Sequence, residues 1–270
     1  TRNVASLSIS TMRWALGVEY DGTQYCGWQA QPALRSVEGD LTLAISLVAD
    51  HEVELVCGGR TDSGVHASGQ VVHFDTTSRR SMHAWMMGAN ANLGPHVSVA
   101  WARPVADHFH ARYSALRRHY RYTIFNRRAR SALAAARSAW IGVPLDIETM
   151  QAAARPLIGE HDFSAFRAAE CQSNSPVRRL DSIVVTRHEH FVHVDVTANA
   201  FLHHMVRNIA GLLISVGRGE RSVTHVADIL ASRDRRRNAA TAPAEGLCLV
   251  AIDYPLAFRL PGCSGIIGHP

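Results

Sequence analysis

One short segment, Gly58 to Ala67, carries three chemically active side chains in a row: the guanidinium of Arg60, the hydroxyl of Thr61 and the carboxylate of Asp62. Glycines flank them at positions 58, 59 and 64, and glycine permits tight turns and the close approach of a ligand. Because an opposite charge nearby favours the ionised carboxylate, we expect Arg60 to keep Asp62 charged. A positioned carboxylate can serve as a covalent nucleophile. The segment is therefore either a catalytic loop around Asp62 or an ordinary turn with a local Arg–Asp pair.

The chain on both sides of this segment alternates between strand and helix patterns. Apolar residues at period two predict strands at 13–20, 52–57, 70–75, 97–104, 118–126, 182–187, 191–197 and 247–254. Apolar residues at helical spacing predict helices at 36–47, 81–92, 147–157, 202–216 and 223–232. Ser36 and Asp146 are the expected N-caps of two of them. Short links between the elements favour antiparallel pairing, so we predict an α+β fold.

Composition narrows the class of protein. The chain has 270 residues, 47% hydrophobic and 19% charged, as in ordinary soluble proteins. No apolar run is long enough to span a membrane, and the polar stretch 1–11 does not resemble a secretory signal. The five cysteines form no C-x-x-C pair, which favours a reducing, cytoplasmic setting. The 16 histidines form no metal motif, so we expect no metal, and we assign His203 and His204 to hydrogen bonding or packing.

Positive charge is concentrated in one part of the chain. The formal net charge is +5, and every one of the 28 basic residues is arginine. The stretch between His108 and Leu145 contains no acidic residue and eight arginines: Arg112, Arg117, Arg118, Arg121, Arg127, Arg128, Arg130 and Arg137. Arginine binds phosphate with a planar, bidentate fork. This stretch therefore predicts contact with a polyanion.

Four motifs, in order along the chain, resemble those of the tRNA pseudouridine synthase A (TruA) family. The first is the Asp62 segment, and the second is Phe109–Ala115 followed by Tyr120-Arg121-Tyr122. The others are Phe201–Ile209 and Ala242–Leu249. Shorter matches at 21–23, 27–29 and 37–38 extend the resemblance over roughly residues 13 to 255.

The resemblance implies roles for individual residues. The family places its nucleophile at Asp62, a paired arginine at Arg207, a tyrosine that stacks on the target base at Tyr120, and a pocket leucine at Leu247. In this mechanism Tyr120 also helps to remove the proton from C5 of the uracil. The substrate-binding residues that we predict beside Tyr120 and Leu247 are Arg60, Arg112, Arg118 and Arg121. Two positions depart from the family pattern, His119 in place of arginine and Cys248 in place of an aromatic residue.

The resemblance also implies an architecture and a substrate. It predicts two related βαβ-rich domains, 12–106 and 107–257, whose mainly antiparallel sheets meet in a common sheet with a basic cleft between them. Segments 1–11 and 258–270 are expected to be flexible tails. The implied activity is isomerisation of uridine to pseudouridine at positions 38, 39 and 40 of the tRNA anticodon stem-loop, by a cytoplasmic homodimer. This reaction needs no cofactor and no metal.

Three other hypotheses remain open. An RNA-binding module without catalysis would keep the arginines and would not need Asp62. A hydrolase or phosphotransferase with an aspartate nucleophile would need further acids for magnesium, and the nearest in sequence, Glu54 and Asp75, have no recognisable metal spacing. A pseudouridine synthase of the same family could also act on another RNA.

Overall fold

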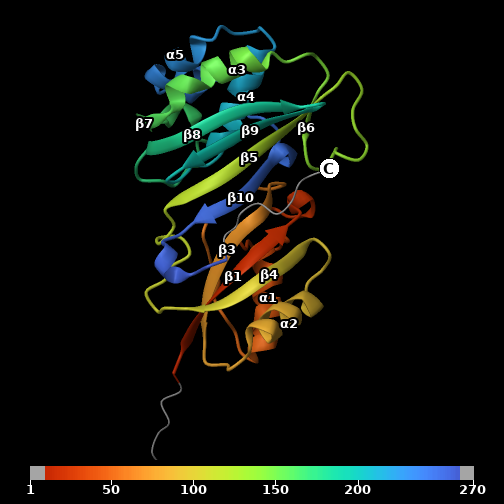
Figure 1. Ribbon diagram of the computed structural model, residues 1–270, viewed down its shortest axis with the longest axis vertical. Helices are drawn as coiled ribbons and strands as arrows, with labels where there is room; N and C mark the ends of the chain where they lie inside the picture. The colour runs from red at the N-terminus through yellow and green to blue at the C-terminus, as the bar shows by residue number, and fades with distance from the viewer. Residues whose placement is uncertain (1–9, 262–270) are drawn as a thin grey trace, which may run out of the picture.

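A single ten-stranded sheet forms the centre of the molecule. The structure, a computed structural model, describes residues 10–261 (Figure 1). The strands along the sheet follow the order β4-β1-β3-β10-β5-β9-β8-β7, with β2 paired to β3 and β6 paired to β5. Their bounds are β1 Met12–Tyr20, β2 Val56–Cys57, β3 His66–Thr76, β4 Val97–Val105, β5 Arg117–Asn126, β6 Ala139–Ile141, β7 Gly159–Asp162, β8 Val177–His188, β9 Phe191–Ala198 and β10 Leu247–Asp253.

Two helices cover the strands built from the first part of the chain. Helix α1 (Val37–Ala49) begins at Ser36, whose side chain accepts a hydrogen bond from the Gly39 amide as predicted for this cap. Helix α2 (Met82–Asn92) packs on the sheet through Trp85, whose ring lies 5.8 Å from that of Trp14 and 5.0 Å from that of Phe74. All three rings are buried, so this cluster fastens α2 to β1 and β3.

Three helices cover the strands built from the later part of the chain. They are α3 (Ile147–Ala154), α4 (Met205–Gly217) and α5 (His225–Ser232). The side chain of Asp146 caps α3 by accepting from the Thr149 amide, as predicted. Helix α4 is apolar on nearly every side, and Figure 1 shows it behind β5 and β9. It ends at Gly217, again as predicted from the sequence.

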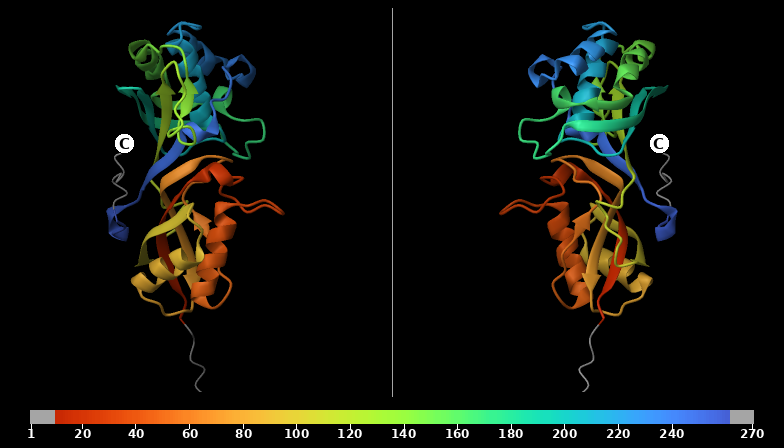
Figure 2. Two further views of the ribbon diagram at one scale, coloured as in Figure 1. Left: turned by 90° about the vertical axis from the view of Figure 1, so that its right-hand side faces the viewer. Right: turned by 90° about the vertical axis from the view of Figure 1, so that its left-hand side faces the viewer.

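The predicted fold class is confirmed, because strands from both parts of the chain join in one mainly antiparallel sheet. The joint is the pairing of β10 with β3, which is parallel and covers only Cys248 opposite His66 and Leu249 opposite Ala67. Figure 2 shows two lobes stacked along the long axis on either side of this joint. We call this pairing the seam. The proposed domain boundaries at 106 and 107 stay predictions.

Some elements differ from those predicted. Only Val56–Cys57 of the predicted strand 52–57 pairs with a neighbour, and the short strands β6 and β7 were not predicted because neither has an alternating apolar pattern. Phe258 packs on the ring of Phe109 at 5.0 Å, so the chain stays packed beyond the predicted start of the C-terminal tail. Residues 1–9 and 262–270 of the predicted tails lie outside the described residues. Among the described helices, none combines the length and the apolar character that a membrane span requires.

Candidate active site

The loop that carries Asp62 connects β2 to β3 at the seam. The Trp28 amide donates to the Thr61 carbonyl at 3.0 Å, and the Val65 amide donates to the Asp62 carbonyl at 3.1 Å. The Thr61 hydroxyl is hydrogen-bonded to the Tyr20 hydroxyl at 2.7 Å. Gly64 has a φ of +77°, a conformation that residues with a Cβ rarely adopt. The backbone on both sides of Asp62 is therefore held in one conformation.

A buried glutamine fixes the start of the same loop. Gln70 on β3 is fully buried, and its side-chain oxygen accepts from the Gly59 amide at 3.2 Å while its amide nitrogen donates to the Gly59 carbonyl. The side-chain amide thus pairs with both polar groups of Gly59, as a neighbouring strand would. This role could not be predicted from the sequence, because a lone glutamine in an apolar strand has no local signature.

Three cationic or potentially cationic groups surround the Asp62 carboxylate. Nε2 of His203 lies 3.2 Å from Oδ1, Nε2 of His204 lies 3.5 Å from Oδ2, and a terminal nitrogen of Arg207 lies 3.6 Å from Oδ2. The predicted proximity of Arg207 to Asp62 is therefore present in the structure. Arg60, the neighbour in sequence, is exposed and makes no ion pair within the described residues.

The first turn of α4 and the residues before it place these partners. His204 is the N-cap of the helix and has a φ of +61°, so its backbone is left-handed. Arg207 lies one turn into the helix, where its Nε donates to the Ala242 carbonyl at 2.9 Å and its own carbonyl accepts from the Ala242 amide at 3.1 Å. These bonds join the motif Phe201–Ile209 to the motif Ala242–Leu249. They leave the end of the guanidinium directed at Asp62.

Electrostatics favour a neutral imidazole next to Asp62. Burial lowers the pKa of His204 below its ordinary value, and the positive charge of Arg207 acts in the same direction. The Asp62 carboxylate opposes this shift without cancelling it. The lowered pKa favours the neutral form of His204 near pH 7, so of the two groups beside Oδ2 of Asp62 it is Arg207 that carries the charge.

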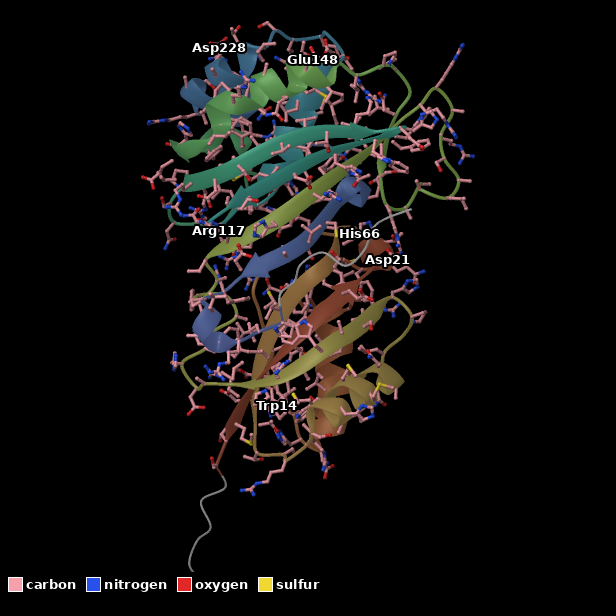
Figure 3. All side chains as sticks on the ribbon, in the orientation of Figure 1. Trp14, Asp21, His66, Arg117, Glu148 and Asp228 are labelled. Carbon is pink, nitrogen blue, oxygen red and sulfur yellow. The ribbon has the colours of Figure 1, made fainter. Side chains whose placement is uncertain are left out.

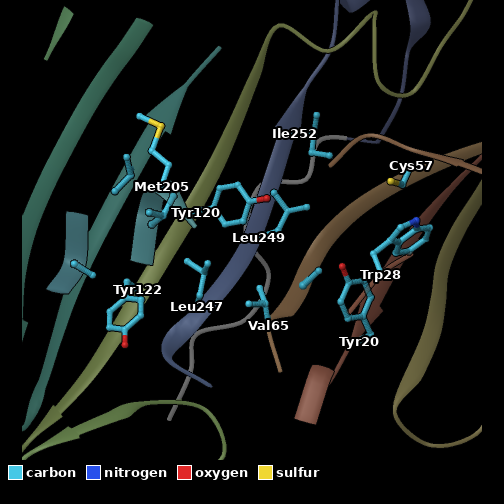
Figure 4. Packing of buried hydrophobic residues seen from close by; sticks show 14 of the residues in the cluster. Tyr20, Trp28, Cys57, Val65, Tyr120, Tyr122, Met205, Leu247, Leu249 and Ile252 are labelled. Carbon is cyan, nitrogen blue, oxygen red and sulfur yellow. The ribbon is translucent and has the colours of Figure 1, made fainter. Parts of the chain in front are cut away.

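Tyr120 lies on β5 on the same side of the sheet as the Asp62 loop. Figure 4 shows its ring beside Leu249 of β10, with Leu247 further along the same strand. The ring is 7% exposed and packs edge-on against Phe201 at 5.0 Å. Burial, and to a lesser extent the Asp62 charge, raise the pKa of Tyr120 above its ordinary value. The resting site therefore presents a neutral phenol and not a phenolate.

Arg118 has a structural position instead of the exposed one that phosphate binding requires. It is 9% exposed, and its five N–H groups donate to four backbone carbonyls, two of them to Gly58 and one each to Arg112, Ala115 and Asn199. No donor remains for RNA, so this geometry speaks against the predicted substrate contact. Arg118 instead fastens β5 to the glycines that precede Asp62.

The other predicted arginines have different surroundings. Arg112, like Arg60, is exposed, and its guanidinium lies over the Tyr113 ring at 5.6 Å. Arg121 points away from Tyr120, as alternation along a strand requires, and binds Asp195 with two hydrogen bonds of 2.7 and 3.1 Å. The structure therefore places Arg121 on the opposite face from Asp62.

A cavity lies on that opposite face. It has a volume of about 620 Å³ and spans the seam, where His66, Arg121 and Cys248 line it. His66 accepts from the Gly22 amide at 3.0 Å, and Figure 3 shows it beside Asp21 at the joint of the lobes. His119, which replaces the arginine of the family pattern, also lines the cavity and binds Asp253 at 2.8 Å. We therefore assign the chemistry to the Asp62 side, where the reactive groups converge.

The chain is similar to known proteins over most of its length. The family model described as tRNA pseudouridine synthase matches residues 17–114 and 153–255. The chain is 54% identical over 250 residues to tRNA pseudouridine synthase A of Vibrio cholerae, covering 93% of this chain and 95% of that one. It is 51% identical to the proteins of the same name from Coxiella burnetii, over 92% of this chain and 95% of that one, and Nitrosococcus oceani, over 94% and 98%. The chain therefore belongs to the tRNA pseudouridine synthase family.

Proposed function

We propose that this enzyme isomerises uridine to pseudouridine in tRNA and that Asp62 is its nucleophile. The observation that carries the proposal is the position of the Asp62 carboxylate at the seam, within 3.6 Å of Arg207 and on the same side as Tyr120. Attack on a flipped base requires a carboxylate, a fixed cationic partner for that carboxylate and an aromatic ring nearby. The site has all three.

The reaction is balanced without an external reactant. The N1–C1′ bond breaks, the freed uracil turns, and C5 forms the new bond to C1′. C5 then loses its proton while N1 gains one, so substrate and product have the same atoms. The protein has to hold the detached uracil, keep water away from it and move that proton. These tasks need a carboxylate, a donor and an apolar wall, all of which the site offers.

Each remaining residue has a task in this proposal. Arg207 orients the Asp62 carboxylate, and its bonds to Ala242 keep the guanidinium in place. Tyr120 replaces part of the stacking that the flipped base loses, and its neutral hydroxyl stands near the reacting ring. Leu247 is 5% exposed and closes the pocket against water.

The RNA-binding part of the proposal depends on exposed positive charge. Arg60 and Arg112 are exposed, and we assign them to phosphate contact in the predicted basic cleft. We propose the anticodon stem-loop at positions 38, 39 and 40 as the target and a homodimer as the working form. The four cysteines within the described residues are free thiols, which is consistent with the proposed cytoplasmic location.

The test is tritium release from tRNA labelled at C5 of uracil, with Asp62→Asn compared against Asp228→Asn. Asp228 is exposed on α5 and serves as the matched control. The proposal expects release by the wild type and the control, and none by Asp62→Asn at unchanged tRNA affinity. Equal release by all three proteins would remove Asp62 from the chemistry. Binding of tRNA without release by any protein would favour an RNA-binding module.

A further inference from the structure

Three metal-binding side chains converge at the nucleophile. The carboxylate of Asp62 and the Nε2 atoms of His203 and His204 lie within 4.8 Å of one another, and within the described residues this is the one such group of three. Nε2 of His203 lies 3.2 Å from Oδ1 of Asp62, and Nε2 of His204 lies 3.5 Å from Oδ2. Ligands about 2.0–2.1 Å from a tetrahedral Zn²⁺ lie about 3.3–3.4 Å apart, so each imidazole is already near the spacing of a ligand from one carboxylate oxygen.

The convergence depends on an unusual backbone. Neighbouring residues in extended chain point to opposite sides, yet both imidazoles face Asp62. The left-handed conformation of His204 makes this possible, and the two rings lie 4.0 Å apart at an angle of 35°. The His203 carbonyl accepts from the Ala168 amide at 3.0 Å, and the His204 carbonyl accepts from the Asn208 amide at 2.9 Å. The positions of the ligands are therefore set before any ion arrives.

We propose that a late first-row divalent ion, represented by Zn²⁺, binds to Asp62, His203 and His204 and inhibits the enzyme. Imidazole and carboxylate suit this class of ion, and three protein ligands leave one position for water. A coordinated Asp62 carboxylate cannot attack the substrate, so the ion and catalysis exclude each other. The side chains are between 21% and 38% exposed, which gives the ion a path from solvent.

Nearby positive charge makes this an inhibitory site and not the site of a resident cofactor. Arg207 lies 3.6 Å from the carboxylate oxygen that faces His204, and the N-terminus of α4 adds the positive end of its dipole. Both repel a divalent cation and weaken its binding. Replacing Arg207 by glutamine is therefore expected to tighten Zn²⁺ binding by about tenfold or more, even with the dielectric constant of water.

The experiment measures Zn²⁺ binding to the tag-free chain by calorimetry, and the inhibition of tritium release over the same range of Zn²⁺. Variants His203→Asn and Arg207→Gln are compared with His83→Asn, because His83 is exposed on α2 in the other lobe. We expect one ion per chain, weakened about tenfold or more in His203→Asn, tightened in Arg207→Gln and unchanged in His83→Asn. Inhibition should follow the measured occupancy, and a chelator should reverse it.

The binding half of the proposal stands apart from the proposed function, whereas the inhibition half rests on it. Absence of binding to the wild type at sub-millimolar Zn²⁺ would overturn the site, as would equal weakening in His83→Asn and His203→Asn. Binding that leaves tritium release unchanged at full occupancy would overturn the inhibition. If no tRNA shows release at all, the proposed function fails, and the calorimetric comparison still decides the site.

Discussion

Replacing Gln70 by leucine tests whether the catalytic loop is held by this one buried side chain. The substitution keeps the approximate volume and deletes the partners of the Gly59 amide and carbonyl. A buried polar group left without a partner costs about 1–3 kcal/mol, so two such groups give a loss of roughly 2–4 kcal/mol after partial rescue by water. Asp62 lies three residues further along the loop, where a displacement of about 1 Å can lower the rate roughly a hundredfold.

Gln151 is a matched control for this experiment. It lies on α3 in the other lobe and makes the same kind of hydrogen-bond pair with the backbone. Its side chain accepts from the Val185 amide at 2.7 Å and donates to the Ile183 carbonyl at 3.3 Å. Gln151→Leu should also lower the free energy of unfolding, by less than Gln70→Leu, because Gln151 is only half-buried and water can replace part of its bonding. It should leave kcat near the wild-type value at temperatures well below unfolding, because it does not contact the Asp62 loop.

Two measurements distinguish a change in the geometry of the Asp62 loop from a general loss of stability. Denaturant unfolding gives the stability of each variant, and initial rates of tritium release give kcat and KM. We expect Gln70→Leu to lower kcat by about 10- to 100-fold with little change in KM. If both glutamine variants lose stability and neither loses kcat, the reasoning that connects Gln70 to the geometry of Asp62 is refuted.

Three further predictions concern Tyr120, the two arginines Arg118 and Arg112, and the buried His73. Tyr120→Phe should lower kcat by about a hundredfold and leave tRNA affinity unchanged in filter binding, since only the hydroxyl is lost; an equal drop in both would contradict the proposed role. Arg118→Met should destabilise the fold without altering the salt dependence of tRNA binding, whereas Arg112→Gln should reduce the slope of that dependence by about one. Burial lowers the pKa of His73 from 6.5 to about 4, so its contribution to stability is present above pH 6.5 and is lost as the pH falls to 4. Its neutral ring accepts from the Ala111 amide, and urea unfolding should show a loss of about 3 kcal/mol over this range that His73→Leu abolishes.

Local signals in the sequence predicted the elements whose causes are local. Ser36, Ser81 and Asp146 each precede an apolar helical pattern, and each caps its helix through the amide three residues ahead. The end of α4 at Gly217 also has a local cause, because Gly219, two residues later, has a left-handed φ of +74°. The strands β6 and β7 were missed because they form by pairing with a neighbour and not by their own pattern. Propensity cannot reveal a strand of three or four residues that a distant partner stabilises.

The site was predictable where it depends on motifs and unpredictable where it depends on the tertiary fold. The motifs identified Asp62, Tyr120 and Arg207, and the fold brings them to one side of the sheet. Arg118 belongs to the same basic stretch as Arg112, and nothing local reveals that only one of the two is buried. The approach of His203 to Asp62 likewise depends on a left-handed residue that is neither glycine nor asparagine.

The residues of the site come from both sides of the seam, so the geometry of the site depends on how rigidly the two lobes are joined. Asp62 comes from the β2–β3 loop, whereas Tyr120 and Arg207 come from β5 and α4, and only two residue pairs of the sheet connect β3 to β10. Arg118 adds two hydrogen bonds across the seam to the Gly58 carbonyl. A Cβ on Gly69 of β3 would lie 2.2 Å from the backbone carbonyl oxygen of Val250 on β10, so the close approach of these two strands requires glycine. These contacts set the distance between Asp62 and Arg207, so under the proposed mechanism we expect residues of the seam to influence the rate.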